Sequence, residues 1–460
     1  MAQQANQSTD STDRQADKLI AIFLADWPVQ SQVANCALML VEAGYRVEIF
    51  LSQTWSYVDL ERLGEVGDIT IYDLTKVEQL VAPASPTVAP VTFWQRCPRF
   101  LAGKVFGLGW LATRMRSAYA VLDMWMRRLL KRVLHRFRMW RNPEGSLLPA
   151  EVVPRALRLM AGKNYRYLIG VEKKGLIWAG QVAERLSVPF LYYSLELYVE
   201  DYERLFRKGS RDFKCLRRVE CKYHHRSAGT IIQDPERASV LLRDNGLSFS
   251  RSPTYYVPVS VLGGLFQQPS SFLRDTLKLP VDCKLVLYFG QICEDRFCLK
   301  VAELAQDFPE DWLLVMHGWP DSPVVLDKIK AVDQRRRVVL SLDMVPAEEI
   351  QHLIASADVG LALYDGKIQN DKLTAFSSEK VALYLQCGLP FVAFDFPGYR
   401  ELAERDRCAA TITSLPGLPR AIQTILAAQA EYRAGAYQAF LKHYDYRSNF
   451  VQVLEGIDHA

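Results

Sequence analysis

A repeated order of strand, helix and strand constrains the fold more than any other feature of this chain. The order begins at Lys18, where "KLIAIFLA" is an apolar run of strand length. Residues 31–45 follow with helical spacing of apolar positions and a glycine near the end, and 46–52 form a second strand-like run. This β-α-β pattern predicts a parallel sheet covered by helices.

The same alternation occurs in two blocks separated by a turn-rich stretch. The first block resumes with strands predicted at 165–172, 189–196 and 228–234 and helices at 175–188 and 235–247. The second block predicts strands at 284–290, 312–318, 338–345, 358–364 and 390–395 and helices at 298–308, 347–357 and 378–388. A chain of 460 residues is too long for one ordinary core. The prediction is an α/β protein with two Rossmann-like parallel-sheet domains that face each other across a cleft, where ligands bind beyond the carboxyl ends of the strands.

The expected domain boundaries follow from this alternation. We predict a disordered lead-in at 1–17, an N-terminal Rossmann-like domain at 18–255, a linker at 256–275, a C-terminal domain at 276–430 and a C-terminal helical segment at 431–460. The polar start lacks the apolar run of a signal peptide, and no stretch predicts a membrane-spanning helix. The nine cysteines include no CxxC pair, which favours reduced thiols over a disulfide framework or a zinc site.

The modest net charge of +4 conceals one strongly basic segment, 96–141. It holds twelve Lys and Arg and one acid, Asp123, which gives +11. On a helical wheel the apolar face includes Trp125 and Trp140, and basic residues lie largely opposite. The residues expected to contact a membrane surface are Trp125, Arg127, Arg128, Lys131, Arg132 and Trp140. A basic amphipathic helix with tryptophans favours an anionic membrane surface. Packing of the apolar face on the N-terminal sheet is the main alternative, and no nucleic-acid motif supports a nucleic-acid partner.

Residues 374–402, "TAFSSEKVALYLQCGLPFVAFDFPGYREL", place Ser377, Ser378 and Lys380 at the start of a predicted helix between two strands. A helix N-terminus offers N–H groups and the positive end of the helix dipole, which suit a phosphate. Either serine can cap the helix and donate a hydroxyl to a phosphate oxygen. A lysine is unfavourable there unless an anion offsets it. The alternative is an ordinary serine cap and a solvated lysine.

The order of these features resembles the nucleotide-sugar-binding domain of the GT-B glycosyltransferases, in particular the retaining branch that builds exopolysaccharides and glycolipids. The resemblance rests on the glycine-ended strand in "YFGQICEDRF", "VMHGWP", "SADVGLALY", the Ser-Ser-x-Lys helix and "GLPFVA", and it is best over 283–402. It implies that Gly290 and Arg296 contact the donor phosphates, Arg296 standing where the family has a lysine. The family's arginine is Gln291 here, and its two glutamates correspond to Ala375 and Leu383, so these groups are missing.

Further cleft residues are expected at other strand ends. His317 and Gly318 end a strand, where the glycine lets a ligand approach the backbone and the histidine can touch the base or the phosphates; a local hydrogen bond is the alternative for the histidine. Glu172 and Glu196 follow strands of the N-terminal half and can orient an acceptor hydroxyl or accept its proton. For Glu196, a structural salt bridge with an arginine is the alternative. The resemblance implies transfer without an obvious enzymic nucleophile, so no carboxylate pair of the glycosidase kind is required.

The sequence therefore predicts a retaining hexosyltransferase-type enzyme that moves a sugar from a nucleotide-sugar donor to a lipid-linked or polysaccharide acceptor. The donor is a substrate, and neither a cofactor nor a metal is expected. The expected location is the cytoplasm, peripheral at the inner face of the cell membrane. The main alternative is a noncatalytic GT-B-like scaffold or partner protein that has lost donor binding, which Gln291 and Leu383 favour. A third possibility is a sugar-nucleotide epimerase of the same fold, but the basic amphipathic segment would have no function in such an enzyme.

Overall fold

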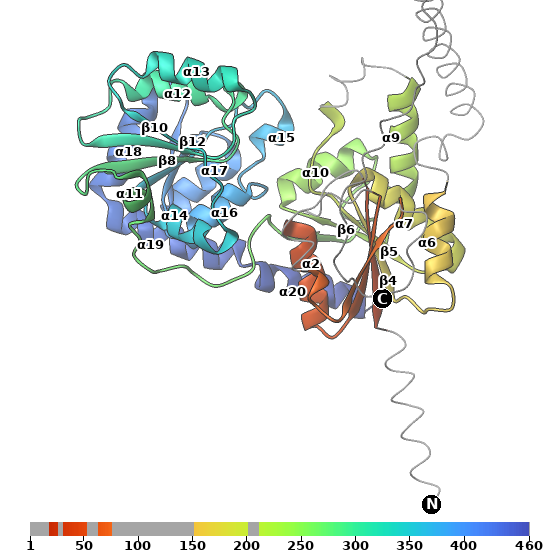
Figure 1. Ribbon diagram of the computed structural model, residues 1–460. Coiled ribbons are helices and arrows are strands. Elements are labelled where there is room, and N and C mark those ends of the chain that lie inside the picture. The colour runs from red at the N-terminus through yellow and green to blue at the C-terminus, as the bar shows by residue number, and fades with distance from the viewer. Residues whose placement is uncertain (1–17, 26–30, 53–62, 76–150, 201–210, 460) are drawn as a thin grey trace, which may run out of the picture.

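A computed structural model of the protein describes residues 18–25, 31–52, 63–75, 151–200 and 211–459. These residues form two α/β units, coloured red to green and green to blue in Figure 1, each built on one parallel sheet. The prediction of two Rossmann-like parallel-sheet domains is confirmed.

The N-terminal sheet has seven strands in the order β3-β2-β1-β4-β5-β6-β7, and all neighbouring pairs are parallel. Its strands are β1 (Leu19–Leu24), β2 (Arg46–Leu51), β3 (Ile69–Asp73), β4 (Tyr167–Val171), β5 (Phe190–Tyr193), β6 (Gly229–Ile232) and β7 (Thr254–Tyr256). β1, β4 and β5 are buried along their whole length. Continuous apolar runs are expected for parallel strands that helices cover on both faces.

Helices bury both faces of this sheet. In the described residues, those between its strands are α2 (Ser31–Glu42), α6 (Val152–Met160), α7 (Glu172–Leu186), α9 (Arg211–His224) and α10 (Pro235–Asp244). One face packs against α6, α7 and α9 in a core that includes Trp178, and the other packs against α2.

The C-terminal sheet has six parallel strands in the order β10-β9-β8-β11-β12-β13. Its strands are β8 (Lys284–Phe289), β9 (Trp312–His317), β10 (Val338–Ser341), β11 (Val359–Ala362), β12 (Phe391–Phe394) and β13 (Ala409–Ile412). Its helices are α11 (Phe272–Leu277), α12 (Cys298–Ala305), α13 (Pro323–Val332), α14 (Ile350–Ala355), α15 (Gln369–Lys372), α16 (Glu379–Gln386), α17 (Pro397–Glu401), α18 (Leu418–Ala427) and α19 (Gln429–Ala439). Short 3-10 or π turns lie at Glu294–Arg296, Ala347–Glu349, Leu402–Asp406, Leu415–Gly417 and Phe440–Tyr444.

The helix α20 (Tyr446–Asp458) returns to the N-terminal sheet after the C-terminal sheet is complete. It lies beside α2, as Figure 1 shows, and its side chains Tyr446, Phe450, Val453 and Ile457 are part of that core. The chain therefore passes between the two units twice, before α11 and again before α20.

The strand order reverses at one point in each sheet, between β1 and β4 and between β8 and β11. Neighbouring loops diverge at such a point and leave a crevice beyond the carboxyl ends of the strands, where ligands of this architecture bind. The candidate residues for the donor and acceptor lie at the end of β9 or follow β4, β5, β8 and β11, so the fold places them at these ends.

Candidate active site

Two glycines bring the loops after β8 and β9 into backbone contact. Gly290 has φ +121° and Gly318 has φ +143°, conformations that suit residues without a side chain. A Cβ on Gly318 would lie 2.0 Å from the carbonyl oxygen of Gly290. The Gly290 amide donates to the carbonyl of His317 (2.9 Å), and the Gly318 amide donates to Ser341 (3.1 Å). A larger residue at position 318 would push the Gly290 loop out of place.

Lys380, in the first turn of α16, lies directly against the Gly290 loop. A Cβ on Gly290 would lie 3.8 Å from the Lys380 ammonium. The ammonium lies 4.6 Å from the ring centre of Tyr288 and 5.7 Å from that of Tyr364. Burial and, after it, the neighbouring charge of Arg296 lower the Lys380 pKa to about 8. Among the described residues, no carboxylate forms an ion pair with this ammonium.

Arg296 reaches the same place from the loop after β8. Its guanidinium lies 4.6 Å from the ring centre of Tyr364 and donates to Asp371 Oδ1 (3.0 Å). The Tyr364 hydroxyl lies 2.7 Å from Ser378 Oγ. The structure therefore brings Gly290, Arg296, Ser378 and Lys380 together around the ring of Tyr364; we call this group the donor cluster.

Neither serine caps α16 with its side chain, although the sequence predicted such a cap. Ser378 is the N-cap residue of α16, but its side chain makes no capping hydrogen bond, because the hydroxyl faces Tyr364 instead. The Ser377 hydroxyl donates to the carbonyl of Leu373 (3.1 Å) and accepts from Arg237 (3.0 Å). Its single proton is already used in this arrangement, so of the two hydroxyls only that of Ser378 lies in the donor cluster.

His317 lies at the edge of the donor cluster, next to Gly318. Its ring is stacked on Phe289, with centres 5.6 Å apart, and Nδ1 lies 2.9 Å from Ser341 Oγ. Burial lowers the pKa of His317, which favours the neutral imidazole at neutral pH. The imidazole thus has the local hydrogen bond that was the alternative to ligand contact.

Glu172 follows β4 directly and is held in an unusual state. Its φ is +59°, in the left-handed region that side chains with a Cβ rarely adopt. Carboxylate Oε1 accepts from the amides of Leu195 (2.8 Å) and Glu196 (3.0 Å), while Oε2 has no hydrogen-bond partner in the described part of the chain. Burial and then the charge of Glu196 raise the Glu172 pKa to about 7, while the neighbouring Tyr198 hydroxyl and the Leu195 amide oppose this rise. A strained, buried carboxylate that titrates near neutral pH is a common property of functional sites.

Glu196 connects the two units. Its Oε2 accepts from Asn370 Nδ2 of α15 (2.6 Å). The side-chain partner is therefore an amide of the C-terminal unit, and the described residues show no salt bridge between Glu196 and an arginine. The next residue, Asp371, binds Arg296. The short helix α15 thus lies between the donor cluster and the carboxylate pair of Glu172 and Glu196.

The three positions where the family has two glutamates and an arginine hold uncharged residues here. Leu383 packs against the C-terminal core, and Ala375 is buried with 3% of its surface exposed. Gln291 is exposed, and its carbonyl accepts from the Tyr288 hydroxyl (2.6 Å). The donor cluster therefore has two cations, Arg296 and Lys380.

Sequence reasoning missed Tyr364, Asn370, Asp371 and Arg237. The first three follow β11, on one side of the point where the strand order reverses, and the rule that ligands bind there could have found them. Arg237 had no such signal, because its contacts at Ser377 and Asn370 lie 140 and 133 residues away along the chain.

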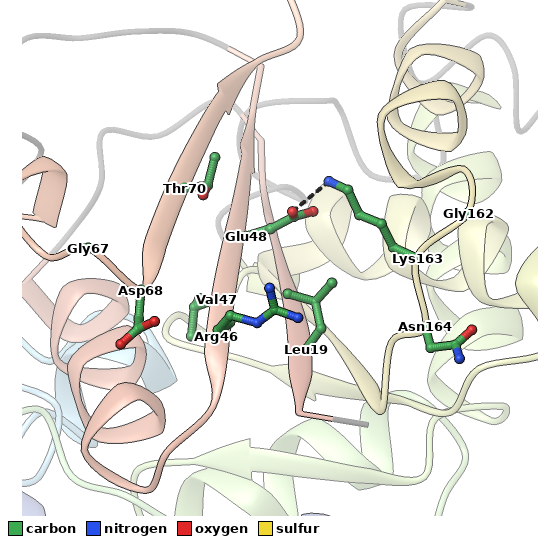
Figure 2. Close-up of a pocket in the computed structure, with 10 residues that line it drawn as sticks. All are labelled: Leu19, Arg46, Val47, Glu48, Gly67, Asp68, Thr70, Gly162, Lys163 and Asn164. Atoms are coloured by element: carbon green, nitrogen blue, oxygen red, sulfur yellow. Dashed lines mark hydrogen bonds and ion pairs between the residues drawn. The ribbon is translucent and has the colours of Figure 1, made fainter. Parts of the chain in front are cut away.

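A cavity of about 410 Å³ lies elsewhere, toward the amino ends of β1, β2 and β3 (Figure 2). Glu48 contacts this cavity and accepts from Lys163 (2.6 Å), from the Tyr165 hydroxyl and from the Tyr72 hydroxyl (3.4 Å). Its carboxylate is fully engaged, and the cavity is at the other end of the sheet from Glu172.

The membrane-contacting residues predicted from the sequence, Trp125, Arg127, Arg128, Lys131, Arg132 and Trp140, lie outside the described residues. Within the described ranges, every helix is too short or too polar to cross a membrane. The same ranges contain no group of three His, Cys, Asp or Glu side chains placed to hold a metal ion.

Solved structures with a similar fold cover nearly the whole chain. HepE of Anabaena, solved in complex with UDP and glucose, matches with a TM-score of 0.62 and 13% identity over 96% of this chain and 100% of HepE. Sucrose-phosphate synthase of Thermosynechococcus elongatus matches with a TM-score of 0.61 and 15% identity over 96% and 98% of the two chains. WaaG, a glycosyltransferase involved in lipopolysaccharide biosynthesis, matches with a TM-score of 0.54 and 12% identity over 94% and 99%.

No protein-family profile matches the sequence, and no curated protein matches it. At these identities the structural matches establish the fold alone: two Rossmann-like domains in the arrangement called GT-B.

Proposed function

We propose that the protein is a glycosyltransferase that takes its sugar from a nucleotide-sugar donor. The observation that carries this proposal is the partly buried ammonium of Lys380, which lies beside Arg296 and has no carboxylate partner in the described part of the chain. A cation at the start of a helix, with a second cation as its neighbour, is unfavourable unless an anion offsets it; Arg296 has Asp371 as a partner, whereas Lys380 has none. A diphosphate has the charge and the oxygen atoms that this position lacks.

The same cations suit the chemistry of sugar transfer. Negative charge grows on the departing diphosphate as the bond between sugar and phosphate breaks. Arg296 and Lys380 are fixed by their contacts with Tyr364 and Asp371, so they stabilise that charge without rearranging. The proposal treats the nucleotide-sugar as a substrate and includes no separate cofactor.

The carboxylate pair serves the acceptor in this proposal. Glu172, whose pKa is about 7, is partly protonated at neutral pH and can exchange a proton with an acceptor hydroxyl. Glu196 lies closer to the donor cluster, because it bonds to α15, and orients that hydroxyl. We place the transfer in the retaining class and propose a lipid-linked or polysaccharide acceptor; both assignments rest on the sequence resemblance.

A thermal-shift panel of nucleoside diphosphates and nucleotide-sugars tests donor binding. UDP and UDP-glucose are the first probes, because HepE has been solved with each of them. We expect at least one compound of the panel to raise the melting temperature of the parent protein. Lys380→Met and Arg296→Met should each weaken binding by about tenfold or more, since a charge-assisted hydrogen bond contributes about 1.5–3 kcal/mol.

Lys328→Met is the matched control, because Lys328 pairs with Glu294 on the surface and should leave binding unchanged. If no compound of the panel stabilises the parent protein, the proposal fails and the noncatalytic scaffold is favoured. Gln291 and Leu383 are the positions that already support that alternative.

The proposal also places the protein at the inner face of the cell membrane, on the strength of the basic segment 96–141. Each basic residue near an anionic surface contributes roughly 1 kcal/mol. Replacement of Arg127, Arg128, Lys131 and Arg132 by glutamate should release the protein from liposomes that contain phosphatidylserine. Trp125→Ser should weaken the binding that remains at high salt. Unchanged liposome binding after the charge reversal would refute the membrane location.

A further inference from the structure

Arg237, which the proposed chemistry does not use, is a buried cation at the boundary of the two units. It lies in the first turn of α10, and none of its surface is exposed. A guanidinium has five N–H donors, and all five have an acceptor here. Its Nε donates to Gln233 Oε1 (2.6 Å), and one donor of Nη2 bonds to the carbonyl of Leu195 (2.8 Å). Both of these acceptors belong to the N-terminal unit.

The other three donors cross to the C-terminal unit. Nη1 donates to the carbonyl of Leu373 (3.1 Å) and to Ser377 Oγ (3.0 Å), and Nη2 donates to Asn370 Oδ1 (3.0 Å). Asn370 Oδ1 also accepts from the amide of Leu197 (3.1 Å), and its Nδ2 donates to Glu196. One side chain therefore bonds to the strand end that carries Glu196 and to the turn that leads into α16.

These contacts are costly as a means of stabilising the fold. Arg237 forms no ion pair with a carboxylate among the described residues, and burial lowers its pKa. Apolar packing in place of a buried charge is often neutral or stabilising in proteins. A guanidinium is planar and has five donors, so it can hold several acceptors in a fixed geometry. An apolar side chain cannot do this.

We propose that Arg237 is a positioning residue that holds Glu196 and the start of α16 in one arrangement at the boundary of the two units. Its role rests on the proposed function, because it acts through the carboxylate pair on one side and the donor cluster on the other. Three of its five acceptors are available only when the two units are together. Arg237 therefore favours the arrangement in which the two units are in contact and opposes their separation.

Two variants and one matched control test the proposal. Arg237→Met removes the donors and keeps an apolar chain of similar length, and Asn370→Ala removes one crossing acceptor in case the first variant does not fold. Arg274→Met is the control. Arg274 lies wholly within the C-terminal unit, where it donates to the carbonyls of Ser356 (2.7 Å) and Cys283 (2.9 Å), so its loss perturbs a partly buried arginine without touching the boundary.

The first measurement needs no ligand. Hydrogen exchange should become at least tenfold faster in peptides over 195–199 and 369–378 in both test variants, and small-angle scattering should show a larger radius of gyration. The control should lower the melting temperature and leave both quantities unchanged. If Arg237→Met and Asn370→Ala exchange and scatter like the parent protein, the positioning role is wrong.

The second measurement separates positioning from donor binding. The probe is hydrolysis of UDP-glucose to UDP and glucose, with water as the acceptor. The KM of Arg237→Met should stay within threefold of the parent value, because the donor cluster lies in the C-terminal unit, and kcat should fall tenfold or more. Arg274→Met should keep both values within twofold. A rise in KM with kcat unchanged, so that kcat/KM falls by the same factor, would overturn the proposal. Failure of the parent protein to bind any nucleotide would instead refute the proposed function, and the exchange result would still decide whether Arg237 holds the two units together.

Discussion

The two ends of each parallel sheet differ in how they accommodate buried charge. Toward the amino ends, Glu48 accepts from Lys163 and two tyrosines, and Asp358 accepts from Arg274 (3.2 Å), Gln429 (3.0 Å) and the amide of Leu285 (2.8 Å). Both carboxylates have opposite charges and several donors around them. These charges are balanced within the protein.

At the carboxyl ends the charges are not balanced. Glu172 has a buried oxygen without a partner in the described residues, and burial raises its pKa to about 7. Lys380 has another cation, Arg296, as its neighbour, and its pKa is lowered to about 8. The difference teaches that buried charge in this fold has two uses. Balanced charges hold the elements together, whereas the unbalanced ones cost stability and are retained where a ligand can complete them.

The largest effect should come from breaking a balanced site. Asp358→Ala leaves Arg274 and the buried amide of Leu285 without an acceptor, so the free energy of unfolding should fall by about 3–5 kcal/mol. Denaturant unfolding measures this loss, and nucleotide binding should survive at low temperature. A loss below about 1 kcal/mol would contradict the comparison.

Glu172→Gln should raise the free energy of unfolding, whereas Asp358→Ala should lower it. The pKa of Glu172 is 4.5 in the unfolded chain and about 7 when folded, so the folded state binds more protons between these values and stability falls as pH rises from 4.5 to 7. The variant should therefore be more stable by about 2–3 kcal/mol at pH 8 and similar to the parent near pH 4.5. Sugar transfer should fall sharply.

Unfolding curves at the two pH values measure this change, with Glu48→Gln as the matched control. Because Glu48 is balanced, its variant should be destabilised. A Glu172→Gln variant that is less stable than the parent at pH 8 would show that Glu172 is structural.

Lys380→Met should raise the stability of the ligand-free protein by a smaller amount. The ordinary pKa of 10.5 is lowered to about 8 in the fold, so the cost of the buried charge is complete below pH 8 and disappears as pH rises to 10.5. We expect a gain of about 1–2 kcal/mol at pH 7, because part of the side chain remains exposed and water screens its charge. The gain should shrink by pH 9.5.

The affinity of the parent protein for UDP should decline above pH 8, because the ligand needs the protonated amine. Titration calorimetry across this range checks the decline, and it should be absent in Lys380→Met. The same pH dependence in both proteins would remove Lys380 from the site.

The smallest effect is expected at Gln291, the position where the resemblance implies an arginine. Gln291→Arg adds a third cation at an exposed position, where an ion pair contributes about 0.2–1 kcal/mol. UDP should bind about twofold to fivefold more tightly, with almost no change in stability. Weaker binding would mean that the loop at 291 does not face the ligand.

Local sequence patterns were sufficient for the sheets and for part of the site. The strands β1, β4, β5 and β8 are continuous apolar runs, and Gly290 and Glu172 could be placed because they directly follow such runs. The strands β3, β7 and β13 were not predicted. They are three to five residues long and only partly buried, so their hydrophobic signal is weak.

The arrangement around α16 could not be predicted from neighbouring residues. The serine cap was a sound expectation from spacing, but Tyr364 binds one hydroxyl and Arg237 the other. The hydrogen bond between Asn370 and Glu196, which was not predicted, joins residues 174 positions apart. Such contacts depend on how two domains dock, which leaves no periodic pattern in the chain.

The return of α20 to the N-terminal sheet has a consequence for how the protein is made. Its Tyr446 hydroxyl bonds to the carbonyl of Gln32, 414 residues earlier in the chain, and its apolar side chains complete the core beside α2. During translation the first domain to emerge from the ribosome therefore keeps one apolar face uncovered until the second domain has been synthesised and α20 follows it. Such a face is prone to aggregation and attracts chaperones. A released chain that ends at residue 440 should therefore bind trigger factor or Hsp70 more strongly than the 460-residue chain does.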